Sequence, residues 1–138
     1  MTNASNEAAI REAFPEVHPG ASPLGARLLV QIKSPKKKTT SSGIVLVEET
    51  KEIEKWNSQV AKVIAIGPLA FCKRDSMEPW PEGAWCSVGD FIRVPKWGGD
   101  RWEVNLPGSD EKALFCIFND HEIIAKVTSD PLSMNIYI

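Results

Sequence analysis

The stretch QVAKVIAIGP, residues 59–68, shows most directly how this chain folds. Its apolar residues fall on both faces of an extended chain and several of them are β-branched, which predicts a strand. Gly67 and Pro68 end this strand, because the pair favours a turn. Residues 27–33, RLLVQIK, have the same character and predict a second strand. Both runs indicate a domain built from β structure.

The rest of the chain repeats this pattern in shorter pieces. Further strands are predicted at residues 91–94, 102–104, 113–118 and 122–127. Asn119-Asp120 is expected to form a tight turn, because both residues tolerate left-handed backbone and bond to the local main chain. After residue 23 no segment shows the 3.6-residue apolar spacing of a helix. We therefore predict an all-β fold, most simply a small barrel.

The two ends of the chain differ from this central part. Residues 1–22 form an N-terminal extension with one predicted helix at 6–14, which Pro15 ends. Several prolines follow, and we expect the extension to be partly disordered. The barrel domain is expected at 23–127, with 128–138 as a C-terminal tail.

Composition excludes several classes of protein. The chain has 138 residues, 43% of them hydrophobic, and a formal net charge of −2, which fits one domain and gives no overall signature of a nucleic-acid binder. No apolar stretch is long enough to span a bilayer, and the N-terminus lacks the apolar run of a signal peptide. Three widely spaced cysteines suggest reduced thiols. We expect a cytoplasmic protein without membrane association.

Two connections are too long for a compact domain and are usually functional or mobile at such lengths. Residues 35–57 carry KKKTTSSG, then the apolar run IVLV at 44–47, then mixed charges. This apolar run could be a buried strand, but its polar flanks favour an exposed binding anchor. Residues 68–88 hold several prolines, so a regular hairpin is not expected there. Trp80 and Trp85 in this segment should pack against the barrel or a neighbouring subunit.

An ordered set of short motifs resembles the GroES-type co-chaperonins of the chaperonin-10 family. The matching elements are Pro23-Leu24, Arg27 with the strand at 28–33, Lys38, Ser42, Gly43-Ile44-Val45-Leu46, Val63-Ile64-Ala65-Ile66-Gly67, Val88-Gly89-Asp90, Trp97-Gly98-Gly99 and Ile123-Ile124-Ala125-Lys126-Val127. The resemblance covers about residues 23–127. Ala26, Ser42 and Trp97 depart from the usual pattern, and this drift is similar to the divergent co-chaperonins that some bacteriophages encode. A phage-encoded protein would act in the host bacterial cytoplasm.

The resemblance implies a lid that closes a folding cage. It implies a homo-oligomeric, heptameric ring whose mobile loops dock Gly43, Ile44, Val45 and Leu46 into the apical domains of a GroEL-type chaperonin. Non-native protein would be enclosed beneath the lid, with Trp97 facing the interior. The first strand, with Leu28, Val30 and Ile32, would pair with the last strand of a neighbour, with Ile123, Ile124 and Val127. The partner chaperonin binds ATP, so the lid would need no cofactor, no metal and no catalytic residue. The segment at 68–88 would form a remodelled roof.

The physics of the loop agrees with this role. Burying each apolar side chain at 44–46 contributes on the order of 1.5–3 kcal/mol, whereas fixing each loop residue costs about 1–2 kcal/mol of backbone entropy. One loop would therefore bind weakly. Seven loops on one ring would raise the effective concentration of each further contact and hold the lid firmly.

Three alternatives have weaker support. A small barrel could bind nucleic acid, but no aromatic residue lies within the basic run at 36–38 to stack a base. The same barrel topology opens medium-chain alcohol dehydrogenases, but a Gly-x-Gly-x-x-Gly motif is missing from this sequence. Cys72, Cys86, Cys116 and His121 could supply a zinc site, but they include no Cys-x₂-Cys pair.

Overall fold

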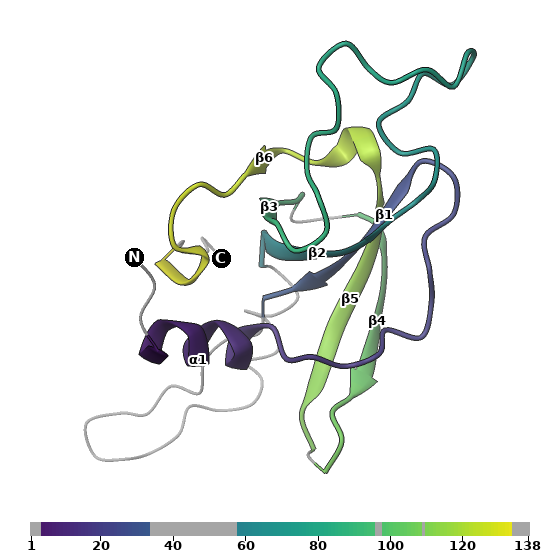
Figure 1. Cartoon of the computed structure of the whole chain (residues 1–138). Helices are drawn as coiled ribbons and strands as arrows, with labels where there is room; N and C mark the ends of the chain where they lie inside the picture. Colours follow the sequence, from purple (N-terminus) through teal and green to yellow (C-terminus); the bar gives the residue numbers. More distant parts are fainter. Residues whose placement is uncertain (1–3, 34–57, 96–97, 109, 134–138) are drawn as a thin grey trace.

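The structure is a computed structural model that describes residues 4–33, 58–95, 98–108 and 110–133. Figure 1 shows a curved antiparallel sheet with one helix beside it. The elements are listed here in chain order: α1 (Ala4–Ala13), β1 (Arg27–Ile32), β2 (Val60–Ile66), β3 (Phe91–Arg93), β4 (Asp100–Asn105), β5 (Lys112–Asn119), the 3-10 turn η1 (Asp120–Glu122), β6 (Ala125–Lys126) and the 3-10 turn η2 (Pro131–Ser133). This confirms the predicted all-β fold of the small GroES-like barrel type.

The six strands lie in the order β4-β5-β1-β2-β3-β6, so β1 is central and β4 and β6 are the outer strands. All neighbours pair antiparallel. Gly67 ends β2 and donates its N–H to the carbonyl of Arg27 at 2.8 Å. A side chain at residue 67 would collide with the main chain of residues 25–27, so only glycine allows this close approach.

The sheet is buried on both faces in its centre. Leu28, Val30 and Ile32 of β1 enter the main core, whereas Leu29 enters a second cluster with Phe115 on the other face. The apolar residues on both faces of β1 are explained by these two clusters, because each successive side chain of a strand points to the opposite face. Trp102, on β4, packs on the second cluster 6.0 Å from the ring of Phe115.

The N-terminal extension is more ordered than the sequence predicts. Helix α1 begins at Ala4, and the ring of Phe14 at its end is buried 5.1 Å from the ring of Phe91. Gln31 donates to the carbonyl of Pro15 at 2.8 Å, and Trp102 Nε1 donates to the carbonyl of Pro19 at 2.8 Å. Residues 4–22 therefore pack as part of the barrel domain, since two of its strands hold them by side-chain hydrogen bonds.

The last predicted strand is shorter than expected. Residues 120–122 form η1, and only Ala125–Lys126 pair as β6. The carboxylate of Asp120 explains the change, because it is buried and accepts the N–H of Phe71 at 2.9 Å. Glu122 accepts the N–H of Asn119 at 2.9 Å, which closes the turn. Asn119-Asp120 thus leads into a 3-10 turn rather than a two-residue hairpin.

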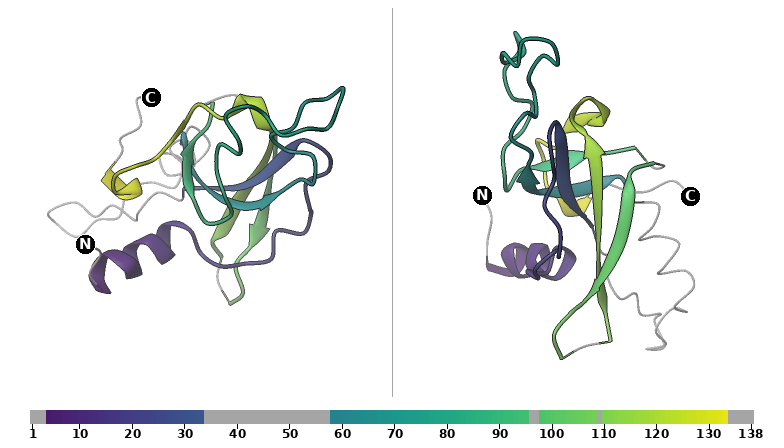
Figure 2. Two further views of the ribbon diagram at one scale, coloured as in Figure 1. Left: turned by 45° about the horizontal axis from the view of Figure 1, so that its top comes forward. Right: turned by 90° about the vertical axis from the view of Figure 1, so that its right-hand side faces the viewer.

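The two terminal segments meet beside the sheet. Leu132 of η2 packs on the cluster formed by Ala13, Phe14 and Val60, and Figure 2 shows η2 close to α1 in both views. Among the residues that the structure describes, no helix has the length and apolar character needed to cross a bilayer.

Candidate functional site

The predicted chaperonin-binding residues Gly43, Ile44, Val45 and Leu46 lie outside the described residues, as does Trp97. The described residues on either side of 34–57 are Lys33 and Ser58. Lys33 donates its N–H to the carbonyl of Val60 at 2.9 Å, so the chain leaves the sheet and returns to it at adjacent points of β1 and β2. We call Lys33, Ser58 and Val60 the loop stem.

The loop stem is held by both ends of the protein. Val60 is buried against Ala13 and Phe14 of the extension. The ammonium of Lys33 donates to the carbonyl of Leu132 at 3.4 Å. These contacts were not predicted from the sequence, although the apolar pair Ile10 and Phe14 on one helix face was a usable signal for packing of the extension.

The structure requires a correction to the predicted subunit contact. Strand β1 pairs with β2 along one edge and with β5 along the other, so it offers no free edge to a neighbour. Its residues Leu28, Val30 and Ile32 are fully buried in the core of the chain. The apolar character of this strand is explained by the barrel interior, and pairing of β1 with another subunit does not fit the fold.

Strand β6 is different, because it ends the sheet. One edge pairs with β3, and Ile124 and Val127 donate their N–H groups to the carbonyls of Arg93 and Phe91. The other edge has no partner strand within the described residues. Ile123 is buried in the core, whereas the side chain of Ile124 is 58% exposed. The unpaired main-chain groups of an open strand edge can pair with another chain, and an exposed apolar side chain beside them favours such association.

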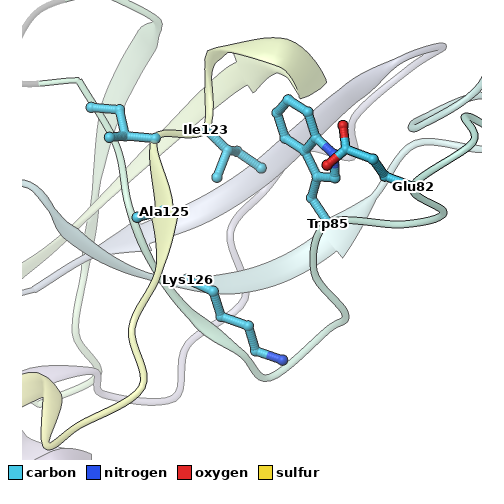
Figure 3. A pocket seen from close by; sticks show the side chains of 6 residues that line it. Glu82, Trp85, Ile123, Ala125 and Lys126 are labelled. Atoms are coloured by element: carbon cyan, nitrogen blue, oxygen red, sulfur yellow. The ribbon is translucent and has the colours of Figure 1, made fainter.

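A pocket of about 310 Å³ lies beside this open edge (Figure 3). It is lined by Glu82, Trp85, Ile123, Ile124, Ala125 and Lys126. Glu82 and Trp85 come from the segment at 68–88, and the other four come from β6 and the residues before it. Trp85 Nε1 is buried and has no hydrogen-bond acceptor among the described residues. We call this space the edge pocket.

The segment at 68–88, which we call the roof, is fixed to the barrel by an aromatic cluster. The ring of Phe71 lies 5.6 Å from that of Trp80 and 6.3 Å from that of Trp85, and the two tryptophans are 4.8 Å apart. All three pack on the main core, which confirms the expectation that Trp80 and Trp85 contact the barrel. Phe71 has a φ of 61°, a strained value for a bulky residue. The hydrogen bond that its N–H donates to the carboxylate of Asp120 stabilises this conformation.

The roof forms no regular hairpin, which agrees with the prediction from its proline content. Its pairing among the described residues is one isolated bridge between Cys72 and Pro79, beyond which the roof tip at 73–78 is exposed. Between these two bridge residues, the main-chain N–H of Lys73 donates to the carbonyl of Glu78 at 2.7 Å. Proline at position 79 lacks the donor that a longer ladder would need.

Two of the three cysteines, Cys86 and Cys116, are buried thiols. Burial raises the pKa of Cys86 to about 11 and that of Cys116 to about 12. Both thiols therefore stay protonated at neutral pH and are poor nucleophiles. No group of three metal-ligating side chains occurs among the described residues, so the zinc alternative gains no support there.

The turn after Trp97 is shaped by two glycines with positive φ, Gly98 at 94° and Gly99 at 75°. A side chain at Gly99 would come within 2.5 Å of Cys116 Sγ. The guanidinium of Arg101 lies 5.6 Å from the ring centre of Phe118 and donates to the carbonyl of Gly98. Close packing against β5 thus requires glycine at residue 99 of this motif.

Comparison with known proteins agrees with this architecture. Residues 21–127 match the model of the family described as "Chaperonin 10 Kd subunit". The chain is also 31% identical, over 105 residues, to a protein named "Co-chaperonin GroES" from Syntrophomonas wolfei subsp. wolfei; the match covers 76% of this chain and 95% of that protein. The family match spans every strand and includes the roof and both sides of the loop stem. The chain belongs to the chaperonin-10 family of co-chaperonins.

Proposed function

We propose that this protein is the lid of a GroEL-type chaperonin, which it binds through residues 43–46 and closes over non-native protein. The observation that carries the proposal is the loop stem. A segment of mostly polar sequence that leaves and returns at adjacent points on a rigid sheet can extend its central IVLV run away from the barrel. That run has the apolar side chains a partner groove would bury.

The lid would be a ring, expected to be a heptamer, with a mass of about 107 kDa for seven copies of 15.3 kDa. Repetition is part of the mechanism, because one loop binds weakly and several linked loops bind tightly. ATP would be bound and hydrolysed by the chaperonin. The lid itself would need no cofactor and no catalytic residue, because its work is to bind and to enclose.

The direct test substitutes Ile44→Ser and Leu46→Ser together and measures binding to a GroEL-type chaperonin in the presence of ATP. Loss of two buried apolar side chains per loop should weaken binding more than about 100-fold. The matched control is Thr39→Ser with Thr40→Ser, which changes two residues of the same segment and should leave binding intact. Unchanged binding of the first variant would refute residues 44–46 as the anchor.

The roof tip has a separate role in this proposal, namely to shape the top of the cage. Replacing residues 73–78 by a short glycine linker preserves the aromatic cluster of Phe71, Trp80 and Trp85, which lies outside the replaced segment. Chaperonin binding should remain, whereas the set of substrates that fold should change. Loss of chaperonin binding would show instead that the roof tip contacts the chaperonin.

A further inference from the structure

A cluster of apolar side chains joins both terminal segments to the loop stem. Its members come from the N-terminal extension, from the starts of β2 and β3, and from η2: Ile10, Ala13, Phe14, Val60, Phe91 and Leu132. We call this group the stem cluster. Phe14 is its largest buried member, 3% exposed and with its ring 5.1 Å from that of Phe91. The stem cluster is separate from the main core and from the second cluster around Phe115.

Most of the stem cluster lies outside the part of the chain that matches the family. The family match covers residues 21–127, so Val60 and Phe91 belong to the shared barrel, whereas Phe14 and Leu132 belong to segments beyond it. These two segments meet at one place. In Figure 1 α1 and η2 lie close together at the left, near the starts of β2 and β3. The terminal segments therefore act on one pair of strand ends rather than on the barrel as a whole.

Hydrogen bonds and burial hold the loop stem at the same place. The ammonium of Lys33 donates to the carbonyl of Leu132 at 3.4 Å, and the main-chain N–H of Lys33 donates to the carbonyl of Val60 at 2.9 Å. On the returning side, Ser58 is 1% exposed, so the chain is buried before it enters β2. Both sides of the loop stem are therefore tied to the rest of the chain by contacts that include the terminal segments.

Such packing controls how often the loop stem opens. Strand ends open more easily than strand centres, and buried apolar contacts raise the free energy of local opening. A stem that has opened must be ordered again when the adjoining segment binds a partner, and fixing one residue lowers the affinity by roughly tenfold. A stem that is already ordered avoids this loss. The stem cluster can thus influence binding by a segment that it does not itself contain.

We propose that Phe14 and Leu132 are positioning residues for chaperonin binding, because they keep the loop stem paired so that residues 43–46 dock without further ordering of the stem. This inference rests on the proposed lid function and adds two determinants outside the binding segment. It assigns a task to the N-terminal extension and to the C-terminal tail. Both residues act through Val60 and Lys33, and not by contact with the chaperonin.

The first measurement is amide hydrogen exchange of the protein alone, in the variants Phe14→Ala and Leu132→Ala. The N–H groups of Lys33 and Gly67 are bonded at opposite ends of the β1–β2 pair. Each variant should speed exchange at Lys33 at least about tenfold more than at Gly67. Leu106→Ala is the matched control, because Leu106 is a partly buried leucine of the second cluster. It should leave the ratio of the two exchange rates unchanged.

The second measurement is binding to a GroEL-type chaperonin in the presence of ATP. Phe14→Ala and Leu132→Ala should keep the oligomeric state of the wild type, since the stem cluster lies within one chain, and should bind at least about tenfold more weakly. Phe14→Leu retains an apolar side chain and should recover most of the affinity, and Leu106→Ala should bind as the wild type does. Leu132 is only partly buried, so its variant should remain folded even where loss of the Phe14 ring unfolds the chain.

Equal acceleration of exchange at Lys33 and Gly67 would overturn the inference, because the stem cluster would then have a purely structural role. The same conclusion would follow from wild-type chaperonin affinity in a folded variant whose Lys33 amide has lost its protection, from equal weakening by the matched control, or from loss of the oligomer in Leu132→Ala. Failure of the lid function is a separate result. The Ile44→Ser and Leu46→Ser variant would then bind normally, whereas the exchange difference between Lys33 and Gly67 would remain.

Discussion

Two apolar runs that look alike in sequence, LLVQI in β1 and IIAKV around β6, have opposite positions in the sheet. The first is paired on both edges and buried on both faces, whereas the second ends the sheet and leaves Ile124 more than half exposed. The run of apolar residues is the same signal in each case. What differs is the number of neighbouring strands, and this is a property of the whole fold that a local pattern does not contain.

The same charge placed in each run should have very different effects on folding. Val30→Asp in β1 puts a carboxylate where the wild-type side chain is fully buried, which should cost more than about 4 kcal/mol and leave the chain largely unfolded. Ile124→Asp should remain folded, with a change of less than about 1 kcal/mol in the unfolding free energy of the monomer. Chemical denaturation followed by circular dichroism measures both. Similar losses in the two variants would show that β6 belongs to the core.

The contrast between centre and edge also applies to the N-terminal extension. Phe14 is buried against Val60 and Phe91, so Phe14→Ala should lower the free energy of unfolding by about 3 kcal/mol. Glu12→Ala is the control, because Glu12 is exposed on the same helix and should change stability by less than about 0.5 kcal/mol. Equal stability of Phe14→Ala and wild type would mean that the extension is a loose addition to the barrel.

The turn η1, which precedes β6, contains the buried carboxylate of Asp120. Asp120→Asn weakens the bond that holds the N–H of Phe71, and it should destabilise the chain by about 1–2 kcal/mol. Because Phe71 anchors the roof, hydrogen exchange of roof amides should increase more than exchange of β1 amides. Exchange that rises equally in both regions would show that the roof and the barrel unfold as one unit.

The buried thiols of Cys116 in β5 and Cys86 in the roof should make the free energy of unfolding depend on pH, with a smaller effect than the substitutions above. Cys116 pairs with Val30 in the centre of the sheet, and burial raises its pKa to about 12, whereas the pKa of Cys86 is raised to about 11. The folded state therefore holds these protons more tightly than the unfolded state, whose thiols titrate near 9. Stability from this source is complete below pH 9; it should decline from pH 9 to about 11 for Cys86 and from pH 9 to about 12 for Cys116. Cys116→Ala should make the decline shallower; an unchanged alkaline slope in that variant would exclude the thiol as its cause.

The sequence was sufficient to predict the strands and the absence of a regular hairpin in the roof. The β-branched apolar run around Val63 and the proline content of residues 68–88 are local features, so they could be recognised without the fold. Packing of Trp80 and Trp85 on the barrel also followed from their size and apolar character.

The partners of the outer segments could not be predicted in the same way. The hydrogen bond from the N–H of Phe71 to Asp120 joins residues 49 positions apart in the sequence, and the one from Lys33 to Leu132 joins residues 99 positions apart. The free edge of β6 follows from strand order, which local propensity does not determine. The prediction that β1 pairs with a neighbouring subunit was wrong for this reason. Its apolar residues are buried in the core of their own chain, and nothing in the run itself distinguishes a core strand from an interface strand.

The most direct test of the lid function is native mass spectrometry of the wild-type protein mixed with a GroEL-type chaperonin, with and without ATP. The free protein should form rings of seven copies, about 107 kDa. One intact ring should add to an end of the chaperonin only when nucleotide is present. Monomers in the free protein, or a chaperonin that gains no mass with ATP, would contradict the proposed lid function.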